Sequence, residues 1–391
     1  MSSESGVDDM TLDVGQQRRL QLVQGLQWLR AAHGDPFAAL LRGHDEDVDA
    51  LNARLLLGEG IRRSETGTWV VARYRTAAAM LADPAFEARF ADWRPGGIPV
   101  MPLTERDLGL APERRAAPGG RARSAAVAHA LARRQSQLAA GVERALDGLA
   151  GQVDLAPVAA RISVEVLAEL LELPAVQRDR LAERQPFAGL ATDSLLCPQG
   201  IVPTRRMLQA IADLRELFGG QPLRLVLAVV GVRVCTDLLL NALLELLASP
   251  AEWAALRADP ASAPGVVEET LRHSPPVRVQ LMVARTDTEV EGQAIQAGHQ
   301  VAILLGSANR DPAVFAEPDR FRPGRKVAPD RVALLPSCPG ELFLPLARAQ
   351  AAVALTALVT RFPGLTMSGA PLRRPKAPAT RGVLRLPVRT F

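Results

Sequence analysis

Residues 334–355, LLPSCPGELFLPLARAQAAVAL, place a thiol and a carboxylate directly before an apolar helical segment. Cys338 is followed by a proline and a glycine, and Glu341 comes three residues after it. A cysteine thiolate is a soft metal ligand, whereas a glutamate carboxylate is a hard one. The segment therefore offers two candidate metal ligands next to a predicted helix.

A second group of charged residues has helical spacing. The segment EETLRHSPPV, residues 268–277, places Glu269 and Arg272 at positions i and i+3, on one face of a predicted helix. Further along, SANRDPAVFAEPDRFRPGR contains Arg320. An isolated ion pair of this kind is common and contributes little when it is exposed. The significance of the pair therefore depends on the segments around it.

Composition excludes several classes of function. The chain has 391 residues, 48% of them hydrophobic, which is enough for a large core. Its net charge of +4 is small for this length, and no basic run is interleaved with aromatic residues, so nucleic-acid binding is not predicted. The three cysteines, Cys197, Cys235 and Cys338, share no metal-like spacing and fit a reducing cytoplasm.

No membrane attachment is predicted either. The N-terminal sequence MSSESGVDDMTLD is polar and acidic and lacks the pattern of a signal peptide. The most apolar stretch, residues 222–248, is interrupted by Arg224, Arg233 and Asp237. This interruption favours a buried helix over a membrane span.

Hydrophobic periodicity predicts a mainly α protein with small β-sheets. Helices are expected over residues 16–32, through most of 121–260 and over 345–361. Strands are expected in residues 60–74, with Gly67 in a turn, and in residues 283–305.

The remaining segments complete a single predicted domain over residues 1–391. Residues 1–15 are expected to be disordered, and the Pro- and Gly-rich residues 94–120 read as a long loop. A last hairpin closes the chain, and no internal repeat or linker divides it.

This order of elements resembles the cytochrome P-450 (haem-thiolate monooxygenase) family along nearly the whole chain. The likeness rests on three segments in family order: NALLELLASPAEWAALRADP, EETLRHSPPV and SANRDPAVFAEPDRFRPGR. The resemblance implies the cytochrome P-450 fold. It also implies that Glu269, Arg272 and Arg320 form a structural Glu–Arg–Arg cluster.

The residues that would hold the haem depart from the family pattern. With Leu346–Arg348 as the anchor of the alignment, the position of the family's ligand cysteine falls on Glu341. Thiolate ligation donates electron density to the iron, which a carboxylate does not supply in the same way. The neighbouring family glycines, which let the backbone pass close to the porphyrin, fall on Leu335, Ser337 and Phe343.

Two further regions depart from the family pattern as well. In the central helix, the acid that delivers protons is replaced by Arg233 and the alcohol by Val234, whereas the small residue remains as Gly231. Arginine cannot act as an acid at neutral pH. At the haem propionates, the family histidine aligns with Gly119 and a basic residue aligns with Met282.

These departures predict a degenerate, collapsed haem pocket, no cofactor and no catalytic residue. Bulky apolar replacements would fill the space, because a cavity of that size would cost several kcal/mol. An alternative is an oxidoreductase that uses Cys338 as an atypical thiolate ligand, since CPG matches the family's C-x-G. However, Cys338 lies eight positions before Leu346, whereas the family's cysteine lies five positions before it.

Haem-free members of this fold accompany glycosyltransferases that attach deoxysugars to polyketide antibiotics, and the chain resembles that auxiliary group. The resemblance implies a non-catalytic, cytoplasmic pseudoenzyme that binds and activates or stabilises the glycosyltransferase of its own pathway as a hetero-oligomer. A small-molecule carrier is a second alternative.

The residues suggest two contacts within and around this scaffold. In the N-terminal helix, Leu22, Val23, Leu26 and Leu29 form a stripe expected to face the core, whereas Leu20 and Trp28 lie off it and are candidates for the partner interface. Within the emptied pocket, Arg233 and Glu341 could form a buried ion pair, or one or both could turn to solvent.

Overall fold

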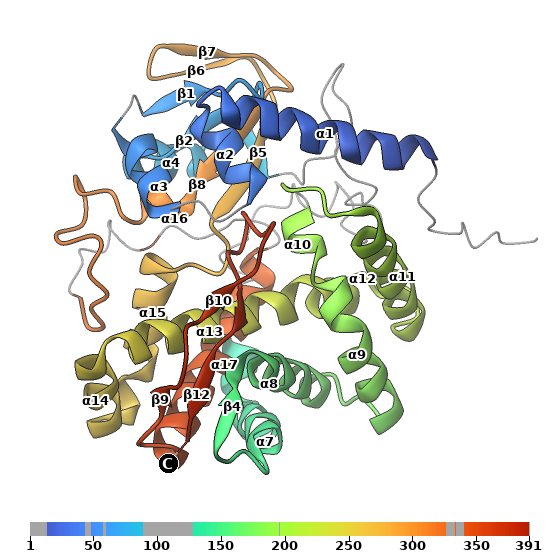
Figure 1. The fold of residues 1–391 in the computed structure, drawn as a ribbon, viewed down its shortest axis with the longest axis vertical. Coiled ribbons are helices and arrows are strands. Elements are labelled where there is room, and N and C mark those ends of the chain that lie inside the picture. Colours follow the sequence, from blue (N-terminus) through green and yellow to red (C-terminus); the bar gives the residue numbers. More distant parts are fainter. Residues whose placement is uncertain are drawn as a thin grey trace, which may run out of the picture.

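A computed structural model describes residues 14–43, 48–57, 60–88, 128–194, 196–325, 333 and 340–390, and for Gln16, Val48, Asp49 and residues 340–342 only the backbone. The described chain is mainly helical with small sheets, as predicted (Figure 1). A part with most of the strands lies above a larger helical part in that view.

The upper part is built on a five-stranded sheet, whose strand order is β1-β2-β8-β5-β3. Its strands are β1 (Ile61–Arg63), β2 (Trp69–Val71), β3 (Phe86–Ala88), β5 (Val279–Ala284) and β8 (Gln300–Leu304). The predicted turn between β1 and β2 is confirmed, with Gly67 at φ +81°. A two-stranded ribbon, β6 (Thr288–Val290) and β7 (Gln293–Ile295), projects beyond the sheet (Figure 1).

Within the described residues, five helices lie around this sheet, of which the N-terminal one is the longest. They are α1 (Val14–Ala32), α2 (Pro36–Arg42), α3 (Val48–Leu56), α4 (Tyr74–Ala82) and α16 (Leu305–Ala308). The start of α2 shows how the sequence fixes a local boundary, because the Asp35 side chain accepts hydrogen bonds from the backbone N–H groups of Phe37 and Ala38. Helix α1 begins at Val14, so the last two residues of the segment expected to be disordered are helical.

The lower part is a set of packed helices around α13 (Val232–Ala248). The others are α7 (Gln135–Leu146), α8 (Leu155–Leu170), α9 (Ala175–Ala188), α10 (Ala191–Ser194), α11 (Ile201–Leu217), α12 (Pro222–Val226), α14 (Pro250–Ala258), α15 (Ala263–His273) and α17 (Gly340–Arg361). Residues 227–231 make a π-helical turn that leads from α12 into α13.

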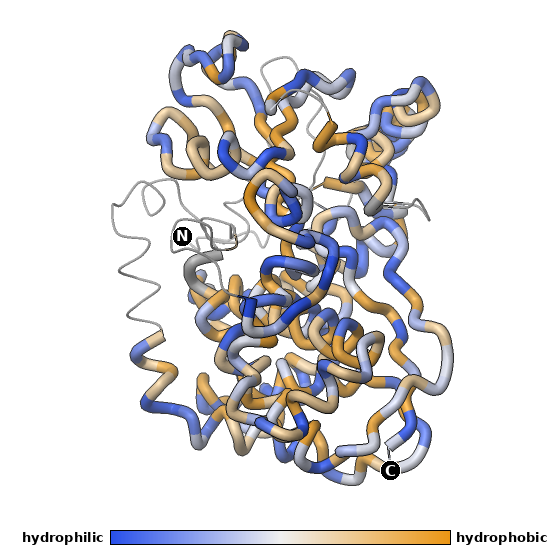
Figure 2. The backbone as a smooth tube through the Cα atoms, turned by 90° about the vertical axis from the view of Figure 1, so that its left-hand side faces the viewer, coloured by the Kyte–Doolittle hydropathy of each residue, from blue (hydrophilic) through white to orange (hydrophobic). Residues whose placement is uncertain are grey.

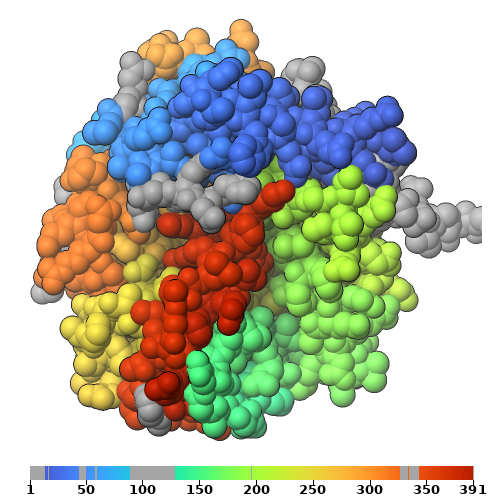
Figure 3. Space-filling view, viewed as in Figure 1, coloured from blue at the N-terminus to red at the C-terminus, as the bar shows by residue number. Residues whose placement is uncertain are grey.

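The C-terminal strands run across one face of the helical part (Figure 3). Strands β12 (Pro387–Arg389) and β9 (Thr366–Met367) form a sheet with β4 (Gln152–Asp154), and β10 (Leu372–Arg373) pairs with β11 (Val383–Arg385). The chain thus ends in the predicted hairpin and in one additional small sheet.

Buried apolar side chains form one large cluster among the helices and two smaller clusters at the sheet. Apolar segments gather in the interior of the helical part (Figure 2). Within the described residues, Phe343–Arg361 is the one helical segment long and apolar enough to cross a membrane, but 61% of its most apolar window is buried inside the protein. The core role of α17 accounts for that composition.

The buried ion cluster forms with a different third member than predicted. The Arg272 guanidinium donates to both carboxylate oxygens of Glu269 at 2.8 and 2.9 Å. The third cation is Arg325, whose Nε lies 3.3 Å from the Glu269 carboxylate. Arg320, the predicted member, has a 65% exposed side chain and pairs with Glu317 instead. Arg320 contributes through its backbone, because its carbonyl accepts from both Arg272 and Arg325.

The orientation of α1 also corrects the sequence prediction. Leu20 and Val23 are buried, whereas Leu22 and Leu29 of the expected core stripe are 51% and 53% exposed. The helix is turned because polar side chains on its inner face also make contacts: Gln27 donates to the Leu196 carbonyl at 3.0 Å, and Gln24 donates to that of Pro198. Leu20 is therefore a core residue and not an interface candidate.

Candidate functional site

The predicted pocket lies where the start of α17 approaches the π-helical turn before α13. Glu341 belongs to the first turn of α17 rather than to a loop, and its side chain is outside the described part of the structure. Gly119, Leu335, Ser337 and Cys338 lie outside the described residues as well. The described walls of the pocket are the helices that carry Gly231 and Phe343.

These two walls touch. The Phe343 side chain is 2% exposed, and its Cβ lies 3.5 Å from the position that a Cβ on Gly231 would occupy. An alanine at 231 would therefore be in ordinary van der Waals contact with Phe343. The side chain that replaces a backbone-exposing glycine in the family pattern thus packs against the central helix.

Arg233 is buried in this region and has a partner that the sequence analysis did not assign. Its Nε lies 2.7 Å from the carboxylate of Asp237, one turn further along α13, and the Asp237 side chain is fully buried. The 2.7 Å distance defines an ion pair, although the alignment of the groups does not meet hydrogen-bond geometry. The charge of Arg233 is thus balanced within its own helix.

Two more charged residues complete the buried cluster around this pair. Asp193, from α10, accepts hydrogen bonds from the Thr380 backbone N–H at 2.9 Å and from its hydroxyl at 2.7 Å. Burial raises the pKa of both Asp193 and Asp237, against the opposing charge of Arg233. Burial likewise lowers the pKa of Arg374 to about 10. The cluster ties α10 and α13 to the segment between β10 and β11, which carries Arg374 and Thr380.

Gly382 lets the C-terminal strands lie directly over the ion pair. A Cβ at this position would come within 2.1 Å of the Arg233 Nη2 and within 2.7 Å of an Asp237 carboxylate oxygen. Real side chains do not approach so closely, so any other residue at 382 would displace the pair. The close approach requires a glycine here.

Neither Val234 nor Met282 carries a group that could deliver a proton to bound oxygen. Val234 is fully buried in the core, and Met282 packs in the small cluster beneath the five-stranded sheet. The neighbouring hydroxyl, that of Thr236, faces α8, where it donates to Ser163 at 3.0 Å, and Gln350 of α17 donates to the same Ser163 oxygen. This buried network holds α8, α13 and α17 together.

The described cysteines are core residues. Cys197 and Cys235 are both buried, and burial raises the pKa of each thiol to about 12. Neither thiol is therefore ionised near neutral pH, which a metal ligand or nucleophile requires. Across the part of the chain that the structure describes, no three His, Cys, Asp or Glu side chains gather as a metal site would need.

Comparison with known proteins identifies the family. The cytochrome P450 family model matches residues 263–389. AknT of Streptomyces galilaeus is 35% identical, with 95% of each chain covered, and DesVIII of Streptomyces venezuelae is 36% identical over 93% of this chain and 91% of its own. The cytochrome P450 family protein EryCII of Saccharopolyspora erythraea is 32% identical over 95% of this chain and 97% of its own. The chain belongs to the cytochrome P450 family.

A solved structure of the family confirms the fold. Epothilone D-bound cytochrome P450epoK superimposes with a TM-score of 0.74 at 22% identity, covering 91% of this chain and 98% of that one. The full-length relatives AknT, DesVIII and EryCII also confirm the predicted branch of the family, that of the P450-like auxiliary proteins of antibiotic pathways.

In a cytochrome P450 the haem would lie between the central helix and the start of α17. A planar macrocycle needs contact distances of about 3.5–4.0 Å on each face, so the atoms facing it stand roughly 7 Å apart. The packing of Phe343 against Gly231 leaves no such gap. Among the described residues, Gly231 and Phe343 therefore do not fit a haem between them.

Sequence reasoning missed most members of the cluster that occupies this region. Asp193, Thr380 and Arg374 are far apart in the sequence and no motif links them. One sequence pattern does indicate a polar cluster at this helix. Polar residues recur every four positions on one face of an otherwise apolar helix, at Arg233, Asp237, Asn241 and Glu245.

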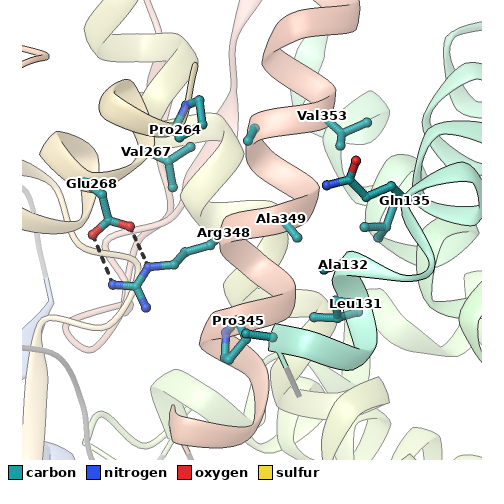
Figure 4. Close-up of a pocket in the computed structure, with 13 residues that line it drawn as sticks. Leu131, Ala132, Gln135, Pro264, Val267, Glu268, Pro345, Arg348, Ala349 and Val353 are labelled. Atoms are coloured by element: carbon teal, nitrogen blue, oxygen red, sulfur yellow. Dashed lines mark hydrogen bonds and ion pairs between the residues drawn. The ribbon is translucent and has the colours of Figure 1, made fainter. Parts of the chain in front are cut away.

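A surface groove runs beside α17, between α15 and residues 128–138 (Figure 4). Its walls are mostly apolar, with Leu131, Val267 and Val353 among them. On one rim the Arg348 guanidinium pairs with Glu268 through contacts of 2.6 and 3.1 Å. Because Arg348 and Glu268 are paired with each other, the described residues of this groove form a concave apolar surface without a set of catalytic groups.

Proposed function

We propose that this protein is a non-catalytic, cytoplasmic helper that binds and activates or stabilises the glycosyltransferase of its own pathway, which attaches a deoxysugar to a polyketide antibiotic. The supporting observation is the contact between Phe343 and Gly231, which fills the place of the haem. A scaffold that keeps its fold and loses its cofactor can still act by binding one state of a partner more tightly than another.

The outer face of α1 is the surface proposed for the partner. Val14, Leu22 and Leu29 are 64%, 51% and 53% exposed and fall on one side of the helix. Trp28 is 47% exposed beside them, with the Arg42 guanidinium 4.4 Å from its ring centre. Large apolar side chains gathered on one exposed face are typical of an interface, and tryptophan is a frequent anchor.

The protein purified after expression with a haem precursor should show no Soret absorption and no stoichiometric iron. The physical reason is that Phe343 contacts Gly231, which leaves no space for the ring between them, and that the Arg233 guanidinium is paired with Asp237. A Soret band that Cys338→Ala abolishes would overturn the haem-free prediction and favour the oxidoreductase alternative.

Co-expression with the pathway glycosyltransferase should give a complex that survives gel filtration and should raise the rate of sugar transfer. The same assay with the transferase alone is the reference. If the transferase is equally active alone and no complex forms, the helper function is wrong.

Within that complex, Trp28→Ala should weaken binding about tenfold or more, because truncation of an anchor typically costs 2 kcal/mol or more of binding energy. Titration of the transferase in a calorimeter measures the change in Kd. Val176→Ala is the matched control, since Val176 is 79% exposed on α9 and lies outside the proposed face. Equal Kd values for both variants would remove α1 from the interface.

A further inference from the structure

The exposed side of α1 carries a glycine that the free protein does not require. Gly25 is exposed in the middle of this helix, and a Cβ at its position would meet no atom within 4 Å. Glycine inside a helix is less favourable than alanine, because it loses more conformational freedom on folding. Alanine would therefore suit the isolated helix better, and the glycine calls for a reason outside it.

Gly25 lies between the projecting apolar side chains of the same face. Leu22 and Leu29 are about one turn to either side of it, and Trp28 lies beside them. These three side chains are 51%, 53% and 47% exposed. A position without a side chain between them makes a notch, which lets the backbone of a second element approach α1 closely.

The element that fits this notch is a helix. The backbone N–H and C=O groups in the middle of α1 are paired within the helix, so a partner can bind this face only through side chains. Strand addition needs an unpaired sheet edge instead. The side chains of a crossing helix pack into the spaces between those of α1, and the distance between the two axes is set by the residues at the crossing point.

The charge on this face has a single sign. Arg18 lies four residues before Leu22, on the same side of the helix, and Arg19 flanks it. Both are exposed, and neither side chain has a hydrogen bond or an ion pair within the described residues. Residues 14–32 contain no Asp or Glu. A partner that buries Arg18 must supply a carboxylate, because a buried charge without a counter-charge is costly.

The inner side of α1 keeps this face pointing outward. Leu20 and Val23 are buried, and Gln24 and Gln27 donate to the carbonyls of residues 198 and 196 at 2.6 and 3.0 Å. Figure 3 shows the dark blue segment that contains α1 uncovered on the face in view. A face that is already fixed loses little conformational entropy when a partner binds.

We infer that the partner glycosyltransferase binds α1 through an amphipathic helix that crosses it at Gly25. Its apolar side chains would pack against Leu22, Trp28 and Leu29, and one of its carboxylates would pair with Arg18. A guanidinium and a carboxylate form a strong, oriented pair, which fixes the register of the two helices. Because the transferase is the occupant, this assignment rests on the helper function proposed above.

Gly25→Ala separates binding from folding. In the free protein it should raise the midpoint of thermal unfolding by about 1–2 °C, because alanine is the better helix former and its methyl group has room. In the complex the same methyl group would meet the crossing helix, so the Kd from calorimetric titration of the transferase should rise about tenfold. A purely structural glycine would not change stability and affinity in opposite directions.

Gly265→Ala is the matched control for this substitution. Gly265 belongs to α15, outside the proposed face, and a Cβ there would meet only the Gly324 nitrogen, at 3.8 Å. This variant should bind the transferase with the wild-type Kd.

Arg18→Glu tests the charge on the face. It should raise the Kd about tenfold or more, because it sets a carboxylate against the partner's carboxylate. Binding of the wild-type protein should weaken as salt is added, since ions screen the attraction, and binding of Arg18→Glu should not. Arg257→Glu is the control, because Arg257 is exposed on α14 and its side chain has no ion pair within the described residues.

The outcomes distinguish this contact from the helper function itself. If the complex forms, but Gly25→Ala and Arg18→Glu bind as tightly as their two controls, the crossing helix is wrong and the helper function stands. If the wild-type protein forms no complex, the helper function fails and the contact with it. A dimer of the isolated protein that Arg18→Glu dissociates would place a second copy on this face, which also overturns the proposal.

Discussion

Asp237→Ala should lower the free energy of unfolding by about 3–5 kcal/mol, because it leaves the Arg233 guanidinium buried without its nearest counter-charge. The side chains of Arg233 and Asp237 are only 6% and 0% exposed, so water cannot replace the lost partner. Chemical denaturation followed by circular dichroism measures the change.

The double variant Arg233→Met with Asp237→Leu separates the charge effect from the packing effect. Replacing both members of a buried pair by apolar residues of similar size is often neutral or stabilising, so the double variant should recover most of the lost stability. Glu216→Ala, which removes one partner of the exposed Arg180 pair, should cost less than about 1 kcal/mol. A double variant as unstable as Asp237→Ala would show that packing, and not charge, dominates.

Glu269→Gln should be similarly destabilising, by about 3–5 kcal/mol, since the Glu269 carboxylate neutralises both Arg272 and Arg325 in a buried cluster. This carboxylate also accepts from the backbone N–H of Arg322 at 2.9 Å, so it fixes the segment after residue 315 as well as α15. Thermal and denaturant unfolding again provide the measurement.

Two arginine variants then decide which residue completes this cluster. Arg325→Gln should destabilise the protein clearly, because Arg325 is 9% exposed and donates to the Ala316, Glu317 and Arg320 carbonyls besides pairing with Glu269. Arg320→Gln should change stability by no more than about 0.5 kcal/mol, as expected for an exposed side chain. The opposite order would restore Arg320 as the third member.

The two parts of the candidate site depend on different kinds of information. A filled haem place is a prediction from residue types alone, since Phe343 is too large for a backbone-exposing position, and the contact of Phe343 with Gly231 supports it. The buried cluster beside it could not be predicted, because Asp193, Asp237 and Thr380 belong to segments with no common motif and are brought together only by folding.

The sequence by itself determined the helical class, the family and the main turns, because these depend on local periodicity and on residues close together in the chain. The Glu269–Arg272 pair is of this kind, being one helical turn apart. The tertiary structure alone decided the rotation of α1, the choice of Arg325 over Arg320 and the partner of Arg233. In each case the local sequence allows two or more arrangements of nearly equal energy, and contacts with distant residues select one of them. Leu20 lies inside and Leu22 outside because α1 must also place Gln24 and Gln27 against the carbonyls before α11, and that requirement comes from residues more than 150 positions away.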